Sequence, residues 1–232
     1  MTVRLRVDGR EFPGELVIFD LDGTLVDSVP DIAAAVDATA VAADLDMPGE
    51  ARVREWVGNG SRTLIRRMLA HGHDRAVAED ELEDAHALFL AAYEARLVKD
   101  SCLYPGTRAL LDGLRDRSVP LACVTNKPEA LACGVLQGLG LGADFRWMLG
   151  GDSLAERKPS AMPLNWVMEQ AGVSAQQCLL IGDSETDVAA ARNAGCSIAV
   201  ARYGYNQGFR EEGDQPDAFF HALSEIEILE PS

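Results

Sequence analysis

Carboxylates stand directly after two apolar runs of this sequence, in positions where they could bind a metal ion. Asp20 and Asp22 follow the run LVIF, and Asp183 and Asp187 follow the run CLLIG. Clustered carboxylates repel one another and raise one another's pKa, so a purely structural role gives no reason to gather them. A hard cation such as Mg²⁺ removes that objection, because it prefers carboxylate, carbonyl, water and phosphate oxygens. If the fold brings these acids together, they indicate a magnesium site.

Three further polar residues occupy similar positions. Thr125 and Asn126 follow the apolar run LACV, and Lys158 stands just before a predicted helix. Taken singly, Thr125 and Asn126 describe only a polar loop or a helix cap. Lysine is scarce in this chain, with three lysines against eighteen arginines. A lysine within such a pattern is therefore less easily dismissed as background.

The segments that carry these residues alternate between strand and helix. Expected strands cover 16–20, 119–125, 145–149, 178–182 and 197–201, and expected helices cover 107–116, 128–139, 161–171, 185–194 and part of 217–229. Such alternation implies right-handed crossovers and a parallel sheet that helices cover on both faces. Ligands of open parallel sheets lie beyond the carboxyl ends of the strands. The polar residues should therefore meet at one edge.

A block of helical spacing interrupts this alternation. Helices are expected at 31–43, 61–71 and 78–98, with breaks at 47–49 and 58–60. The predicted fold is a doubly wound, Rossmann-like α/β core, residues 1–28 and 100–232, with an inserted all-helical cap at 29–99. Before the first strand, VRLRVDGREF fits either a small hairpin around Asp8-Gly9 or a frayed tail.

Composition limits the partners. The 232 residues carry a formal charge of −16, which repels nucleic acid and anionic membranes at long range. No apolar run reaches the roughly 18 residues of a membrane span. The five cysteines are odd in number and widely spaced, which favours free thiols over disulfides. We expect a cytoplasmic protein that binds neither nucleic acid nor membranes.

Four ordered motifs resemble those of the haloacid dehalogenase superfamily of phosphotransferases. They are FDLDGTLVDS, the threonine after VPLACV, the lysine before Pro159, and GDSETD. The helical block is similar to that family's cap. The stretches DLDGTLVDSVPD, VREWVGNGS, VTNKP and GGDSLAERKP are similar to the bacterial phosphoglycolate phosphatase branch.

The resemblance implies roles for the acids. Asp20 matches the nucleophile that attacks phosphorus and becomes an aspartyl phosphate. Asp22 matches the general acid that protonates the leaving alkoxide and then acts as base on water. Asp20, the backbone carbonyl of Asp22, and Asp183 match the Mg²⁺ ligands. Asp187 matches the acid that orients the water shell of the metal or the lysine.

The resemblance also implies a phosphate site. Thr125 matches the residue that hydrogen-bonds a phosphoryl oxygen, and Asn126 beside it is a further phosphate-binding candidate. Lys158 matches the lysine that neutralises the charge of nucleophile and phosphoryl group. Gly23 would let backbone amides approach the phosphoryl oxygens closely.

The cap offers candidates for substrate specificity. Asn59, Gly60 and Arg62 lie in a glycine-flanked loop that opens a helix. They fit a loop that meets the non-phosphate end of a substrate, such as a carboxylate. They fit equally an interhelical turn with a serine N-cap and a solvated arginine.

These observations predict a Mg²⁺-dependent phosphatase of a small phosphorylated metabolite, acting as a monomer or homodimer. The favoured substrate is 2-phosphoglycolate, hydrolysed to glycolate and phosphate. The alternatives are a phosphatase of another small sugar phosphate, a phosphomutase of the β-phosphoglucomutase type, and a catalytically silent binding module. Dehalogenase activity is disfavoured because Asp22 is present, and phosphonate hydrolysis because residues 29–98 contain no lysine.

Overall fold

The centre of the molecule is a sheet of six parallel strands in the order β10-β9-β8-β3-β6-β7. The structure is a computed structural model that describes residues 3–72, 76–205 and 214–229. In sheet order the strands are Ala218–Phe220 (β10), Ser197–Ala201 (β9), Cys178–Gly182 (β8), Leu16–Phe19 (β3), Leu121–Val124 (β6) and Trp147–Leu149 (β7). The predicted parallel sheet is confirmed.

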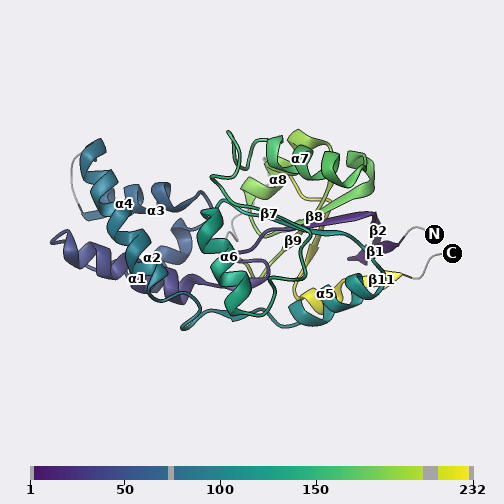
Figure 1. The fold of residues 1–232 in the computed structure, drawn as a ribbon, viewed down its shortest axis with the longest axis horizontal. Helices are drawn as coiled ribbons and strands as arrows, with labels where there is room; N and C mark the ends of the chain where they lie inside the picture. The colour runs from purple at the N-terminus through teal and green to yellow at the C-terminus, as the bar shows by residue number, and fades with distance from the viewer. Residues whose placement is uncertain (1–2, 73–75, 206–213, 230–232) are drawn as a thin grey trace.

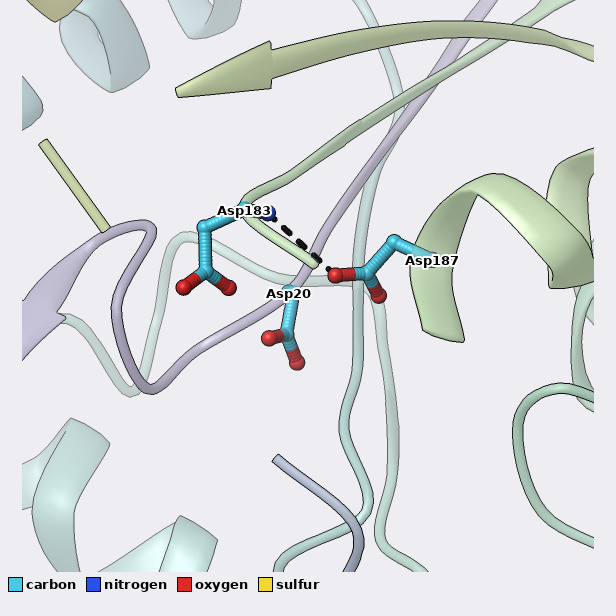
Figure 2. A group of neighbouring side chains, drawn as sticks. All are labelled: Asp20, Asp183 and Asp187. Carbon is cyan, nitrogen blue, oxygen red and sulfur yellow. Dashed lines mark hydrogen bonds between the residues drawn. The ribbon is translucent and has the colours of Figure 1, made fainter. Parts of the chain in front are cut away.

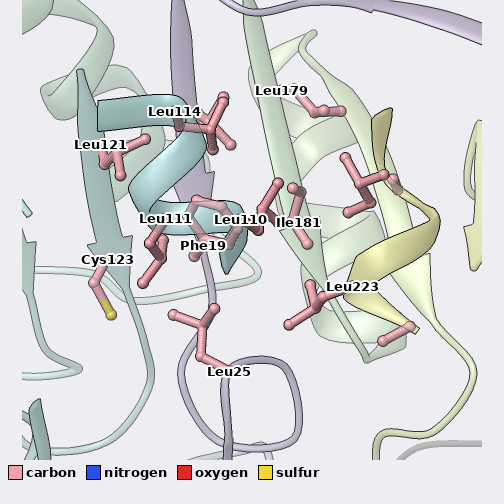
Figure 3. Close-up of a cluster of buried hydrophobic side chains, with 14 of the residues drawn as sticks. Phe19, Leu25, Leu110, Leu111, Leu114, Leu121, Cys123, Leu179, Ile181 and Leu223 are labelled. Atoms are coloured by element: carbon pink, nitrogen blue, oxygen red, sulfur yellow. The ribbon is translucent and has the colours of Figure 1, made fainter. Parts of the chain in front are cut away.

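Four helices cover the two faces of this sheet. They are Thr107–Asp116 (α5), Glu129–Gly138 (α6), Met162–Ala171 (α7) and Glu185–Ala194 (α8). Successive residues of a strand point to opposite faces. Val17 and Phe19 of β3 accordingly pack in the apolar cluster that includes α5 and α6, as Figure 3 shows for Phe19, whereas Leu16 and Ile18 pack with α7 and α8. The sheet is doubly wound, as predicted.

The helical block lies at one end of the molecule, and both termini lie at the other (Figure 1). It consists of Val29–Ala42 (α1), Gly49–Trp56 (α2), Ser61–Gly72 (α3) and Glu79–Glu94 (α4), of which α2 was not expected. Two short antiparallel strands, Val26–Asp27 (β4) and Cys102–Leu103 (β5), join the block to the core. No described helix combines the length and apolar character of a membrane span.

The N-terminal segment forms the hairpin rather than a frayed tail. Arg4–Val7 (β1) and Arg10–Pro13 (β2) are antiparallel, and Asp8 and Gly9 between them have φ angles of 49° and 73°. Positive φ at both turn residues is what a two-residue hairpin loop requires.

The helix expected within residues 217–229 is wrong. The segment contains β10, a single 3₁₀ turn at Leu223–Glu225 (η2), and the strand Glu227–Leu229 (β11); a second 3₁₀ turn, Ala175–Gln177 (η1), precedes β8. Strand β10 pairs with β9, and β11 pairs antiparallel with β1. Without β10 and β11, the backbones of β9 and β1 would be unpaired along one edge. Pairing between distant segments therefore outweighs the local spacing of apolar residues.

Candidate active site

Three neighbouring strands bring the predicted residues to one edge of the sheet. Asp20 follows β3, Asp183 follows β8, and Thr125 follows β6. Strand β3 pairs directly with both β8 and β6, so the three strand ends are adjacent. The expectation that separate motifs meet at the carboxyl ends of the strands is thereby met.

Lys158 joins two of the acids. Its Nζ donates to Asp20 Oδ1 at 2.8 Å and to Asp187 Oδ1 at 2.6 Å, and the residue is only 3% exposed. Burial disfavours the charged ammonium, but the carboxylates of Asp187 and Asp20 outweigh burial and raise the pKa of Lys158. The lysine is therefore a fixed positive charge beside Asp20.

Asp187 supports this arrangement from the first turn of α8. Its Oδ2 accepts hydrogen bonds from the backbone amides of Asp183 (3.2 Å) and Ser184 (3.1 Å) and from Ser184 Oγ (2.6 Å). Figure 2 shows the bond to Asp183. With Oδ1 bound to Lys158, both carboxylate oxygens hold protein groups. This geometry favours orientation of the lysine over orientation of a metal's water shell.

Three buried carboxylates form a group, namely Asp20, Asp183 and Asp187. One oxygen from each lies within 4.8 Å of the other two. The side chains of Asp20 and Asp183 lie side by side in Figure 2. Burial raises the pKa of Asp20 to about 6 despite the opposing effect of Lys158. Burial and the charge of Asp20 raise the pKa of Asp183 well above its usual range. Burial and mutual repulsion therefore disfavour charge on these carboxylates even with Lys158 beside them.

The charge balance and donor set of the site fit a divalent cation. Its ionisable side chains are four carboxylates and two ammonium groups, namely Asp20, Asp22, Asp183, Asp187, Lys127 and Lys158. With all six charged, two negative charges are uncompensated. Hard divalent cations prefer such oxygen ligands, and a cation between Asp20 and Asp183 would offset this excess.

Gly23 is required where the first loop approaches Asp183. Its φ is +89°, and a Cβ atom built there would lie 2.3 Å from Asp183 Oδ2. Any side chain would therefore displace a candidate metal ligand. The backbone of the loop can approach the site only because residue 23 is glycine.

The carboxylate of Asp22 has two partners. Ser28 Oγ donates to Oδ1 at 2.5 Å, and Lys127 Nζ lies 3.0 Å from each oxygen. Lys127 is 7% exposed, and the charge of Asp22 outweighs burial and raises the pKa of the lysine. The sequence reasoning did not select Lys127, although it directly follows Thr125-Asn126 and is one of three lysines.

A pocket opens between this edge and the helical block. Asp20, Asp22, Thr125 and Lys127 line its core side, and mainly apolar residues of the block line the other. Thr125 is 4% exposed. Asn126 also lines the pocket and joins its two walls, because its Nδ2 donates to the backbone carbonyls of Lys158 (2.9 Å) and Gly58 (3.2 Å).

The three cap candidates have different positions. Gly60 lines the pocket. Asn59 Nδ2 donates to Thr186 Oγ1 at 3.1 Å, so Asn59 contacts the core beside the site without lining the pocket. Arg62 forms ion pairs with Glu79 and Glu83 and is not among the described lining residues. Of its two interpretations, the structure favours a surface arginine.

The comparisons with known proteins agree with this geometry. A family model described as haloacid dehalogenase-like hydrolase matches residues 17–201. A phosphoglycolate phosphatase of Pseudomonas putida is 46% identical over 209 residues, covering 88% of this chain and 76% of that protein. One of Nitrosococcus oceani is 39% identical, covering 93% and 96%.

Solved structures give the same result. The crystal structure of a predicted phosphoglycolate phosphatase from Haemophilus somnus matches with a TM-score of 0.86 at 34% identity, covering 91% of this chain and 95% of that one. CbbY from Rhodobacter sphaeroides, at 22% identity and a TM-score of 0.78, shares the fold. The chain belongs to the haloacid dehalogenase-like hydrolase family.

Proposed function

We propose that the protein hydrolyses 2-phosphoglycolate to glycolate and phosphate through an aspartyl phosphate on Asp20. The observation that carries the proposal is the buried Lys158 ammonium, 2.8 Å from Asp20, which neighbours Asp183 and lines the same pocket as Asp22. The substrate follows from relatives called phosphoglycolate phosphatases at 39–46% identity over most of the chain.

The first step transfers the phosphoryl group to the protein. A carboxylate oxygen of Asp20 attacks phosphorus, and the bond from phosphorus to the leaving oxygen breaks with its electron pair on that oxygen. Asp22, protonated at the start of this step, gives its proton to the leaving oxygen. Glycolate therefore leaves with a neutral hydroxyl group. Thr125, Lys158 and the backbone N–H of Asn126, whose side-chain amide already donates to Lys158 and Gly58, hold the phosphoryl oxygens, because phosphoryl transfer depends mainly on positioning and charge neutralisation.

The second step regenerates Asp20. Asp22, now a carboxylate, takes a proton from a water molecule whose oxygen attacks the phosphorus. The bond between phosphorus and the Asp20 oxygen breaks and frees inorganic phosphate. Mg²⁺, held by Asp20, Asp183 and the backbone carbonyl of Asp22, would supply positive charge to the phosphoryl oxygens.

The helical block supplies the wall opposite the chemistry. We propose residues 29–99 as a cap that covers the pocket, attached to a core of residues 1–28 and 100–232 through β4 and β5. Asn126 ties this wall to the core through its hydrogen bond to Gly58. The cytoplasmic location and the monomeric or homodimeric state stay predictions from the sequence.

Release of inorganic phosphate tests the proposal. Purified protein with Mg²⁺ is assayed on 2-phosphoglycolate, glycerol phosphate and a set of sugar phosphates, with Asp20→Asn as the inactive control. We expect the highest kcat/KM for 2-phosphoglycolate and no turnover by the variant. Transfer of phosphate between positions of a sugar phosphate without release would instead indicate a phosphomutase. No reaction with any substrate would contradict the proposed enzyme.

A further inference from the structure

Lys127 and Tyr93 form a polar corner of the pocket that the proposed steps at phosphorus do not use. Lys127 comes from the loop after β6, and Tyr93 comes from α4 of the helical block. The lysine Nζ lies 4.5 Å from the centroid of the tyrosine ring, close enough for a cation–π contact. The corner is therefore made jointly by the core and the cap.

The hydroxyl of Tyr93 is buried near Lys127 without a well-aligned hydrogen bond. The residue is 1% exposed, and its hydroxyl has no hydrogen bond of normal geometry to a described residue, although Lys127 is near enough to act on it electrostatically. Poor hydrogen-bond geometry at a buried polar group is unfavourable. Phe89 stacks on the ring at 5.7 Å and fixes it in place. A ligand oxygen beside Lys127 would give the hydroxyl a better-aligned partner.

Lys127 can also accept a ligand. An ammonium group has three N–H donors, and the hydrogen bonds to the two oxygens of Asp22 use at most two of them. Among the described residues that line the pocket, Lys127 is the one cationic side chain. The wall around it includes Ile32, Leu64 and Leu131, which offer no charge. A negative group away from phosphorus would find its counter-charge at Lys127.

The position of Lys127 sets which negative group fits. A general acid must lie within hydrogen-bond reach of the leaving oxygen, and Lys127 Nζ is 3.0 Å from both oxygens of Asp22. The leaving oxygen and Lys127 are thus both within one hydrogen bond of Asp22. In 2-phosphoglycolate the carboxylate carbon is two bonds from the leaving oxygen, so its oxygens fall within reach of Lys127.

We propose that Lys127, together with the hydroxyl of Tyr93, binds the carboxylate of the substrate and determines the preference for 2-phosphoglycolate. This inference rests on the proposed phosphatase function and adds the residues that select the substrate.

A pair of substrates that differ only in the carboxylate tests the inference. Ethyl phosphate has a methyl group where 2-phosphoglycolate has its carboxylate. The quantity measured is the ratio of kcat/KM for 2-phosphoglycolate to kcat/KM for ethyl phosphate. Differences in leaving-group chemistry between the two substrates are common to all variants, so changes in this ratio report recognition of the carboxylate.

Two variants and two controls complete the design. We expect Lys127→Met to lower the ratio about 10- to 100-fold, the range of a lost charged hydrogen bond. Tyr93→Phe should lower it about 3- to 10-fold without lowering the Tm, because the hydroxyl has no well-aligned hydrogen bond to lose. The matched controls, Lys99→Met at an exposed lysine and Tyr104→Phe outside the pocket, should keep the wild-type ratio.

The outcomes separate this inference from the proposed function. A wild-type enzyme that hydrolyses both substrates equally well would overturn the role of Lys127 and leave a phosphatase. Equal losses on both substrates in Lys127→Met would show that the lysine acts only through Asp22. If Lys127→Met fails to fold, an unchanged ratio in Tyr93→Phe would refute the carboxylate site. Failure of the wild type to release phosphate from any ester would remove both proposals.

Discussion

The raised pKa of Asp20 makes the stability of the metal-free protein depend on pH in a specific way. A carboxyl group with a raised pKa in the folded state favours folding when protonated, and its contribution is lost as the pH rises through the folded value. The pKa of Asp20 rises from its ordinary 3.8 to about 6. At about 1.36 kcal/mol per tenfold change in proton affinity, this corresponds to about 3 kcal/mol.

The substitution Asp20→Asn isolates this effect. Urea unfolding of metal-free protein at pH 4 and at pH 7.5 gives the free energy of unfolding at each end of the window. We expect this free energy to fall between the two pH values by about 3 kcal/mol more in the wild type than in Asp20→Asn. Loss of the Asp20 charge also relieves Asp183, whose pKa that charge raises, and this acts in the same direction.

The control is an aspartate without such surroundings. Asp116 is exposed near the end of α5, so Asp116→Asn should retain the wild-type pH profile. If Asp20→Asn and the wild type lose stability in parallel between pH 4 and pH 7.5, burial does not raise the pKa of Asp20. The carboxylates of Asp20 and Asp183 would then give no electrostatic reason to bind a divalent cation.

Three further predictions concern neighbouring groups. Saturating Mg²⁺ at about 100 times its Kd should stabilise EDTA-treated protein by about 2.7 kcal/mol and restore phosphate release, and a Tm that ignores Mg²⁺ would exclude the site. Asp187→Ala should lower the free energy of unfolding by about 3–5 kcal/mol, because Lys158 loses a buried partner and the backbone amides of Asp183 and Ser184 lose their acceptor; a loss under about 1 kcal/mol in urea would contradict this. Arg62→Ala should change KM less than about twofold, because Arg62 pairs with exposed glutamates, and a large rise would place it in substrate binding.

The positions of the core residues could be predicted because strand topology fixes them. Asp20, Thr125 and Asp183 each follow an apolar run that reads as a buried strand, and such runs pair in a parallel sheet covered by helices. Parallel strands present their carboxyl ends at one edge. The order of β8, β3 and β6 then makes these residues neighbours, whatever the details of the loops.

The C-terminal strands could not be predicted because their partners are distant in sequence. Strand β11 forms against β1, which lies at the other end of the chain. A short segment with weak apolar periodicity forms a strand when an unpaired sheet edge is available to it. Local residue propensity does not show where such an edge lies. The same limit applies to α2, whose eight residues contain one buried side chain, Val53.

The cap residues escape sequence reasoning for a different reason. Which face of a cap helix meets the substrate depends on how the helix is rotated against the core, and no motif fixes that rotation. Arg62 and Tyr93 show the consequence: the charged residue next to the glycine loop pairs with glutamates, whereas an aromatic residue inside an apolar face lines the pocket. Lys127 bonds Asp22 and contacts Tyr93, and it thereby links the loop after β6 to α4. In this fold, catalytic positions can therefore be predicted from the strand ends, whereas substrate specificity depends on contacts between the cap and those strand ends.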